Sequence, residues 1–454
     1  MMAGLAGLLA LPVHAAGPQA AEDDIEALMK QAAEDDAKMA AQAAAPAGKS
    51  TAGEGGGLEG YAQFELARVN SSPAHWSKML TRLEFGDHGK SGTGFKWKWS
   101  LRADYDGVFN ATNFYNQDVK RDQQFNLSVR DLYADFSLGN WDMRVGRQQV
   151  VWGEMVGLFF ADVVSAREMR EFILPEFNIL RIPQWAVRAE YFGDDFHGEV
   201  LWIPVPTYDE TGKPGSDYFP YQVPGLVATN YLNEIKPARK LSNGNFGVRG
   251  GWLVGGWDFS AFYYRSMDAA PTFYRDESLA PGTFTYQARH DRIWQYGGTL
   301  AKDFGTVVLK GEVVATRGRG QTVTALNYSD GLARQNTFDW ALSLDIPFEN
   351  ETRVNLQAFQ SIVTNHDPNI IPEKYESGYS VLINGKPAPR FEAEVLWIAS
   401  LDRNDWLARP KVIWNFEKNW RLVLGADVFH GPPTGLFGRF ANRDRLYSEI
   451  KYSF

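Results

Sequence analysis

The chain has 454 residues, of which 14% are aromatic and none is cysteine, and it carries a formal net charge of −9. No window approaches the roughly 18 apolar residues that a membrane-spanning helix needs, which excludes a helical membrane protein. The charges include no basic field that could collect nucleic acid. So many aromatic residues, in a chain whose mean hydropathy is −0.34, are typical of an outer-membrane β-barrel with aromatic girdles.

The amino-terminal segment predicts export. Ala3–Val13 is a short apolar run, and Val13-His14-Ala15 offers a cleavage site, so we expect residues 1–15 to be a signal peptide. The basic segment that normally precedes such a run is missing, which indicates a shortened start; the alternative is the apolar beginning of a cytosolic protein. Residues 16–57 then form an acidic, Ala-rich periplasmic leader and a Gly-rich linker, the leader being either a short helix or disordered.

From residue 58 onward, apolar and polar side chains alternate with the period of two that a β-strand requires. In 95–105, aromatic and aliphatic residues point one way, and Lys, Arg, Ser and Asp residues point the other. Such a strand has lipid on one side and a wet lumen on the other. We therefore predict an all-β fold, a single transmembrane antiparallel β-barrel over residues 58–454.

The barrel is expected to have about 18 strands, an even number as a single-chain barrel requires. They are predicted at 58–70, 76–86, 94–106, 123–138, 141–152, 182–193, 196–203, 243–254, 257–267, 291–302, 306–317, 335–346, 351–364, 376–384, 390–402, 406–416, 420–430 and 444–454. The signal is weakest at 196–203 and 376–384, and the loss of one hairpin would give 16 strands. In the strand 335–346, Leu342 is expected to face lipid and Ser343 the lumen.

Short and long connections alternate along the chain, as periplasmic turns and external loops do in such barrels. Gly139-Asn140 and Gly255-Gly256 are among the tight turns, and 153–181 and 204–242 are among the long loops. This alternation places both ends of the barrel on the periplasmic side.

The last residues alternate in the same way and end on Tyr452 and Phe454. We interpret this amphipathic segment as the closing strand and as the signal read by the barrel-assembly machinery. The alternative is an edge strand of a soluble sheet, which the rest of the chain disfavours.

The segment 153–181 is too apolar for a free external loop and too charged for lipid, so we expect it to fold into the lumen. Ser165 is predicted to cap a short helix through Phe172, with Glu168 completing a capping box. The segment would then set the width and charge of a pore, or its charges would pair with wall bases and pin it. The candidate constriction residues are Glu154, Asp162, Arg167, Glu168, Arg170, Glu171 and Arg181, with Arg144 and Arg188 on the lumen wall.

Three motifs now carry a family resemblance: Gly146–Glu154 (GRQQVVWGE), Asp162–Phe172 and Arg181–Trp185. Together with the closing stretches 403–410 and 429–440, they resemble the proteobacterial outer-membrane family catalogued as domain of unknown function 1302. The resemblance implies a porin-like barrel, with a more distant similarity to alginate-export barrels. Because members tend to accompany exporters of lipid-like or hydrophobic compounds, it also hints at such a cargo.

Catalytic chemistry has little support in the sequence. No metal-binding pair such as H-E-x-x-H, no nucleotide-binding loop and no serine elbow stands in a credible context, so no metal or cofactor is expected. The adjacent pairs His290-Asp291 and His366-Asp367 are the only hint of a barrel enzyme. A structural partner of an export complex is the other alternative.

The sequence therefore favours an outer-membrane, porin-like channel for small, hydrophobic or lipid-like molecules and not an enzyme. Its expected partners are outer-membrane lipid and lipopolysaccharide, the barrel-assembly machinery and an inner-membrane exporter. No nucleic acid is expected among them.

Overall fold

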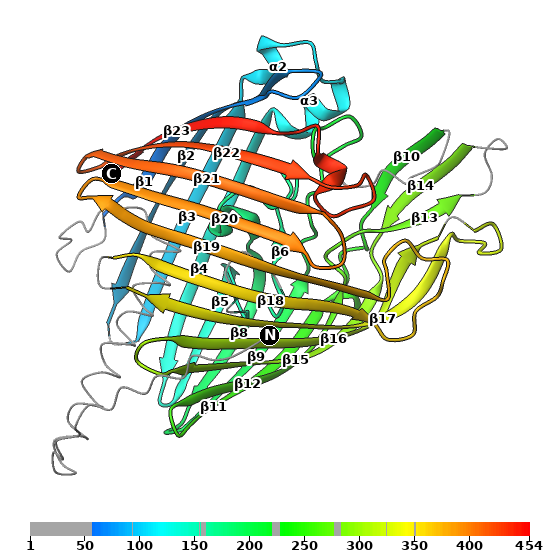
Figure 1. The fold of residues 1–454 in the computed structure, drawn as a ribbon. Helices are drawn as coiled ribbons and strands as arrows, with labels where there is room; N and C mark the ends of the chain where they lie inside the picture. Colours follow the sequence, from blue (N-terminus) through cyan, green and yellow to red (C-terminus); the bar gives the residue numbers. More distant parts are fainter. Residues whose placement is uncertain are drawn as a thin grey trace, which may run out of the picture. The chain divides into compact units, whose positions relative to one another are not determined.

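The computed structural model describes residues 57–92, 94–153, 155, 160–219, 228–276, 283–323, 325–348 and 351–454. Within them, 18 antiparallel strands form one closed sheet (Figure 1). Each strand pairs with its neighbour in chain order, and the last pairs with the first. The predicted signal peptide and most of the predicted leader lie outside the described residues.

The barrel strands are β1 (Glu59–Val69), β2 (His75–Ser91), β3 (Phe95–Asp106), β4 (Phe125–Leu138), β5 (Trp141–Gln148), β8 (Gln184–Phe192), β9 (Phe196–Val205), β11 (Asn245–Val254), β12 (Trp257–Met267), β15 (Arg292–Asp303), β16 (Val308–Thr322), β17 (Leu332–Pro347), β18 (Arg353–Val363), β19 (Tyr375–Ala388), β20 (Phe391–Ser400), β21 (Trp406–Glu417), β22 (Trp420–His430) and β23 (Arg445–Ser453). All 18 predicted strands are confirmed, including the two weakest, which are β9 and β19.

The predicted register is also confirmed. Leu342 on β17 is 47% exposed on the outer face, whereas Ser343 is 2% exposed and accepts a hydrogen bond from Asn355 on β18. The final strand follows the same rule, because Leu446 and Ile450 are exposed while Arg445 and Lys451 are buried on the lumen side.

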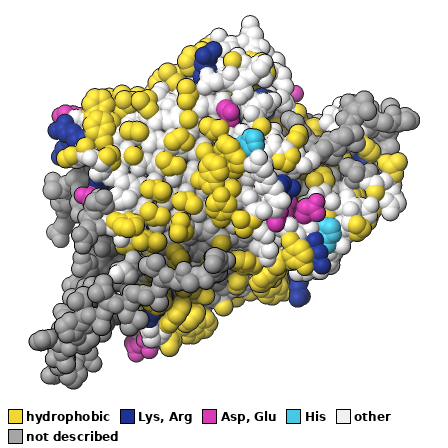
Figure 2. Space-filling view, viewed as in Figure 1, with side chains coloured by type: hydrophobic (Ala, Val, Ile, Leu, Met, Phe, Trp, Pro, Cys, Tyr) yellow, Lys and Arg dark blue, Asp and Glu magenta, His cyan; other side chains and the backbone are white. Residues whose placement is uncertain are grey.

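An apolar band covers the outside of the barrel. Figure 2 shows apolar side chains spread over the visible wall, where a lipid bilayer would contact them. At the short-turn end, the exposed rings Trp414 of β21, Trp420 of β22 and Phe454, which follows β23, lie on neighbouring segments, as an interfacial girdle requires. Of the described residues, no helix is long and apolar enough to span a membrane.

The barrel closes through its two terminal segments. Backbone hydrogen bonds join Gly60 and Phe454 in both directions, at 3.0 and 2.9 Å. Tyr452 packs its ring against Trp420, with the ring centroids 4.8 Å apart. The predicted closing strand is therefore the strand that completes the barrel.

The end with the long loops carries small elements that the sequence did not predict. A three-stranded sheet consists of β10 (Ala228–Ile235), β14 (Thr283–Arg289) and β13 (Thr272–Asp276), and β10 and β14 are parallel. Two short helices, α2 (Val108–Ala111) and α3 (Gln117–Gln123), lie above the ends of β2 and β3 (Figure 1). The other short helices are α4 (Phe177–Leu180), η1 (Leu241–Asn243) and η2 (Gly438–Phe440).

The predicted helix from Ser165 to Phe172 is wrong. Residues Ala166–Arg167 form a two-residue strand, β6, that pairs with β7 (Arg181–Ile182). The Ser165 hydroxyl does not cap a helix, because it donates to the carbonyl of Val150 at 3.0 Å. Phe172 has φ +56°, a left-handed conformation that would itself end a helix.

Candidate functional site

The long segment between β5 and β8, called the insert below (residues 149–183), crosses the barrel lumen. On one side, Glu312 of β16 accepts hydrogen bonds from the backbone N–H groups of Met155 and Ala161, at 2.9 and 2.8 Å. Farther along, Glu171 forms ion pairs with Lys78 of β2 and Arg445 of β23, at 2.5 and 2.9 Å. Because β2 and β16 are separated by eight strands in either direction around the barrel, the insert is attached to opposite walls.

Arginines of the barrel wall donate hydrogen bonds to backbone carbonyl groups of the insert. Arg409 of β21 donates to the carbonyls of Ile173 and Leu174, at 3.3 and 2.5 Å. On the opposite stretch, Arg130 of β4 donates to the carbonyls of Asn178 and Arg181, at 2.6 and 2.8 Å. These charged donors satisfy carbonyl groups that an irregular segment would otherwise leave unpaired inside the barrel.

Several predicted constriction residues pair with one another within the insert or with a second loop. The buried Asp162 accepts from Nε of Arg181 at 2.6 Å, which joins the two ends of the insert. Arg170 lies among three carboxylates, those of Asp122, Glu168 and Glu210, at 3.4 to 3.7 Å. Glu154, the remaining acid predicted for the constriction, lies outside the described residues.

Arg144 and Arg188 lie on the lumen face of β5 and β8, and neither pairs with an acid in the described part of the insert. Arg144 forms its ion pair with Asp135 of β4 at 2.6 Å. Arg188 pairs with Glu190 at 2.6 Å and with Glu199 at 3.1 Å. The bases that hold the insert are instead Lys78, Arg130, Arg409, Arg421 and Arg445.

A second loop meets the insert inside the barrel. The Asp209 carboxylate accepts from the backbone N–H of Arg167 at 2.7 Å, and burial raises the pKa of this carboxyl group to about 6. Two backbone hydrogen bonds connect Glu210 with Arg167 and Met169. The sequence predicted this loop as wholly external, so a segment that is hydrogen-bonded to the insert was missed.

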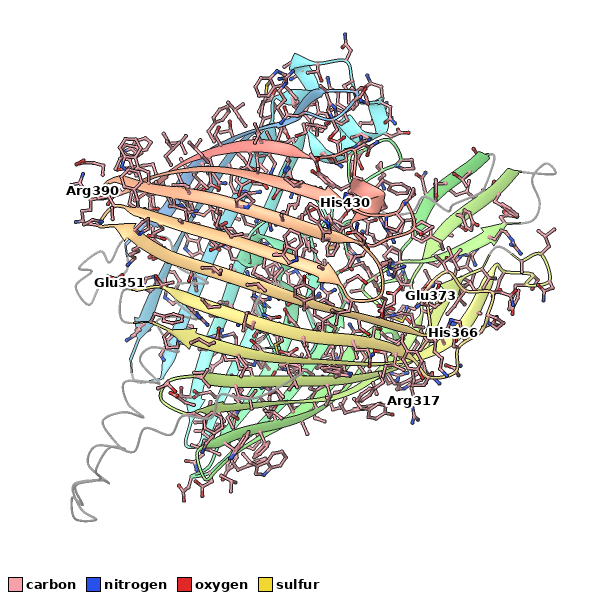
Figure 3. The ribbon with its side chains drawn as sticks, viewed as in Figure 1. Arg317, Glu351, His366, Glu373, Arg390 and His430 are labelled. Atoms are coloured by element: carbon pink, nitrogen blue, oxygen red, sulfur yellow. The ribbon has the colours of Figure 1, made fainter. Side chains whose placement is uncertain are left out.

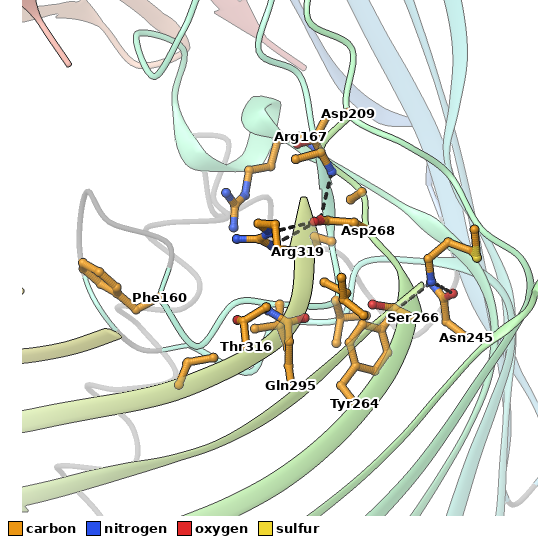
Figure 4. A pocket seen from close by; sticks show the side chains of 18 of the residues that line it. Phe160, Arg167, Asp209, Asn245, Tyr264, Ser266, Asp268, Gln295, Thr316 and Arg319 are labelled. Atoms are coloured by element: carbon orange, nitrogen blue, oxygen red, sulfur yellow. Dashed lines mark hydrogen bonds and ion pairs between the residues drawn. The ribbon is translucent and has the colours of Figure 1, made fainter. Parts of the chain in front are cut away.

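A cavity of about 330 Å³ lies between the insert and the wall formed by β12, β15 and β16 (Figure 4). Arg319 forms a bidentate ion pair with Asp268, at 2.7 and 3.2 Å, and both side chains line the cavity. The side chains of Arg167 and Phe160 also line the cavity. The lining of this cavity therefore combines paired charges with apolar surface.

Apolar side chains border this charged region on the lumen side. Met169 and Ile173 of the insert, with Phe359 of β18 and Leu396 of β20, pack against one buried apolar cluster that includes Phe172 and Leu174, and all four are only partly buried. The Phe359 ring lies over Gly378, where a Cβ atom would come within 2.5 Å of it. A half-buried apolar row in a lumen is unusual, because barrels commonly line their lumen with polar groups.

The described residues contain no group of three or more His, Asp or Glu side chains that could hold a metal ion. The two His-Asp pairs do not assemble a catalytic dyad. His290 contacts the Asp268 carbonyl and the Glu234 carboxylate, at 2.8 and 2.7 Å, and Nε2 of His366 contacts the Pro372 carbonyl at 3.1 Å. Both histidines therefore serve loop structure.

The closed 18-strand sheet, the outer apolar band and the lumen insert define a porin-like β-barrel of the outer-membrane type. The chain belongs to the family described as "Protein of unknown function (DUF1302)", whose model matches residues 1–415. The family resemblance of the sequence motifs is thereby confirmed.

Two solved structures, with TM-scores of 0.51 and 0.50, agree with the fold. OccAB2 of Acinetobacter baumannii is similar over 88% of this chain and 98% of its own, with a TM-score of 0.51 and 10% identity. OccAB3 of the same organism is similar over 88% and 99%, with a TM-score of 0.50 and 9% identity. Salmonella typhi OmpF in complex with daunomycin is similar over 88% and 97%, with a TM-score of 0.42 and 13% identity. A comparison with curated protein sequences finds no match.

Proposed function

We propose that the protein is an outer-membrane channel that passes small hydrophobic or lipid-like molecules. The observation that carries the proposal is the row of half-buried apolar side chains on the lumen face, formed by Met169, Ile173, Phe359 and Leu396. A permeating molecule that covers this row gains about 25 cal/mol for each Å² of apolar surface removed from water. A sugar of equal size gains little from the same contact.

The paired charges of the lumen cavity and of the insert support the same substrate class. Asp268 with Arg319 and Asp162 with Arg181 are neutralised pairs, so they offer dipoles and hydrogen bonds with little net charge. An amphipathic molecule would contact the apolar row with its hydrocarbon part and the pairs with its polar group. The barrel-assembly machinery and an inner-membrane exporter are the protein partners that we propose for such a channel.

The proposal is tested by flux into liposomes that contain the purified protein. The variant Phe359→Asn/Leu396→Asn is expected to slow entry of a medium-chain fatty acid several-fold and to leave entry of a hexose unchanged. Asn384→Gln, which alters a polar lumen residue of β19 outside the row, is the control. Equal loss for both solutes, or no loss for either, would contradict a role of the row in selecting the cargo.

A further inference from the structure

A second cavity, of about 520 Å³, lies at the long-loop end of the barrel near the ends of β5, β8 and β9. Trp185 marks its lipid-facing side, because this ring is 41% exposed while its neighbours Gln184 and Ala186 are buried on the lumen side. Arg147 and Val205 pair with Trp185 from the two adjacent strands and also line the cavity. The cavity therefore reaches the lipid-facing side of the wall at the long-loop end, and it shares Thr207 with the lumen cavity.

The cavity combines an apolar floor with basic side chains. Trp185, Pro204 and Pro206 supply apolar lining, and Arg239 and Lys240 lie at its rim, both exposed. Lys236 also lines it but is engaged by Glu210 and Glu234, at 3.3 and 3.5 Å.

None of the other bases has a carboxylate partner among the described residues. Arg147 donates Nε to the backbone carbonyl of Val129 at 2.6 Å, and no ion pair involves it. For Arg239 and Lys240, no ion pair is formed within the described part of the chain. Three cations are thus presented around a partly apolar cavity.

The basic character continues along the outer wall. Trp294 of β15 pairs with Arg265 of β12 on one side and with Arg317 of β16 on the other. Arg317 points away from the barrel at the long-loop end (Figure 3) and lies over the Tyr296 ring at 5.6 Å. Arg292 donates to the carbonyls of Ser242 and Gly244, both at 2.9 Å, which fixes the segment that leads from the cavity to this row.

We propose that the cavity and the adjoining row bind the phosphorylated disaccharide of lipopolysaccharide in the outer leaflet. At this level of the barrel, outward arginines stand beside aromatic rings, which match the phosphate and acyl boundary of such a lipid. Guanidinium groups donate paired hydrogen bonds to phosphate oxygens, and Lys240 adds a compact positive charge. The exposed apolar lining would contact the sugar face and the first acyl carbons.

The test measures binding of bisphosphorylated lipid A to the full-length protein in detergent. Removing two phosphate-binding cations, as in Arg239→Gln/Lys240→Gln, is expected to weaken binding about tenfold, the usual effect of losing charge-assisted hydrogen bonds. Adding a second pair of changes, Arg265→Gln/Arg317→Gln, to the first is expected to weaken the binding of lipid A further. All four side chains are exposed, so the fold should be kept, which the heat-dependent gel shift of the barrel verifies. The control Lys90→Gln/Lys418→Gln removes two exposed lysines at the opposite end and should bind as the parent does.

Weaker binding in the site variants, normal binding in the control and poor binding of dephosphorylated lipid A would support the proposal. Equal binding by site variants and control would overturn it, as would equal affinity for lipid A with and without phosphates. Equal affinity for phosphatidylglycerol would show general attraction to anionic lipid and would also overturn it.

Discussion

Glu171→Gln removes the central attachment of the insert without leaving a buried charge unpaired. Glu171 accepts from Lys78 and Arg445 at 2.5 and 2.9 Å. In the variant, Lys78 keeps Glu65 at 3.0 Å and Arg445 keeps Asp427 at 2.8 Å. Loss of function would therefore reflect release of the insert and not collapse of the wall.

The free energy that the ionised Glu171 contributes to holding the insert follows from the lowered pKa of this side chain. Burial raises its pKa, but the charges of Lys78 and Arg445 outweigh burial and hold the pKa at about 2, below the ordinary 4.5. The side chain is 24% exposed, and a difference of this size corresponds to about 3 kcal/mol at 1.36 kcal/mol per unit. Because the folded-state pKa is depressed, this stabilisation is present above pH 4.5 and is lost as the pH falls through about 2.

Two assays measure the release of the insert in Glu171→Gln. In planar bilayers at pH 7, Glu171→Gln is expected to show frequent larger-conductance states, which the parent protein should show only near pH 2 to 3. Trypsin should cut the insert at Arg167 or Arg170 faster in the variant. The control Glu376→Gln removes an ion pair with Arg403 of 2.6 Å at the barrel rim, outside the insert. Unchanged conductance and trypsin resistance in Glu171→Gln would refute the reasoning.

Three further predictions concern lipid contact, assembly and selectivity. Ile383→Arg places a charge on the lipid face and should cost about 2–4 kcal/mol of barrel stability in urea titrations, whereas Asn384→Arg on the lumen face should cost little; equal costs would show a wrong register. Deletion of Phe454 removes the backbone pair with Gly60 and should reduce the heat-modifiable barrel in outer-membrane fractions, so normal yield would reject the assembly signal. Arg167→Glu should shift reversal potentials towards cation preference if this side chain, which lines the lumen cavity, borders the path; an unchanged potential would assign it only to structure.

The barrel wall could be predicted from the sequence because its pattern is local. In 391–400, for example, each residue's face follows from its position, since side chains alternate along a strand and neighbouring strands pair in chain order. The lumen position of Arg409 and Arg445 follows in the same way. The weakly patterned β9 and β19 were predicted as well, although the sequence left open a 16-strand barrel that lacks one hairpin.

The position of the insert could be predicted from the sequence, but its conformation could not. Its attachments join residues far apart in the chain, such as Arg445 with Glu171, 274 positions away, and Glu312 with Ala161, 151 positions away. The capping pattern at Ser165 was misleading because the hydroxyl donates to the carbonyl of Val150 and does not cap a helix. The parallel pairing of β10 with β14 is likewise a long-range contact that no local pattern announces.

The conductance of the channel with and without the insert tests most directly whether the insert constricts the lumen. The purified protein and a variant in which residues 160–178 are replaced by a short Gly-Ser linker are reconstituted in planar bilayers, after heat-modifiable migration shows that both barrels are folded. The parent is expected to show small conductance and the variant a several-fold larger conductance, because the insert occupies the lumen. Equal conductance, or none in either folded protein, would contradict a lumen channel that the insert constricts.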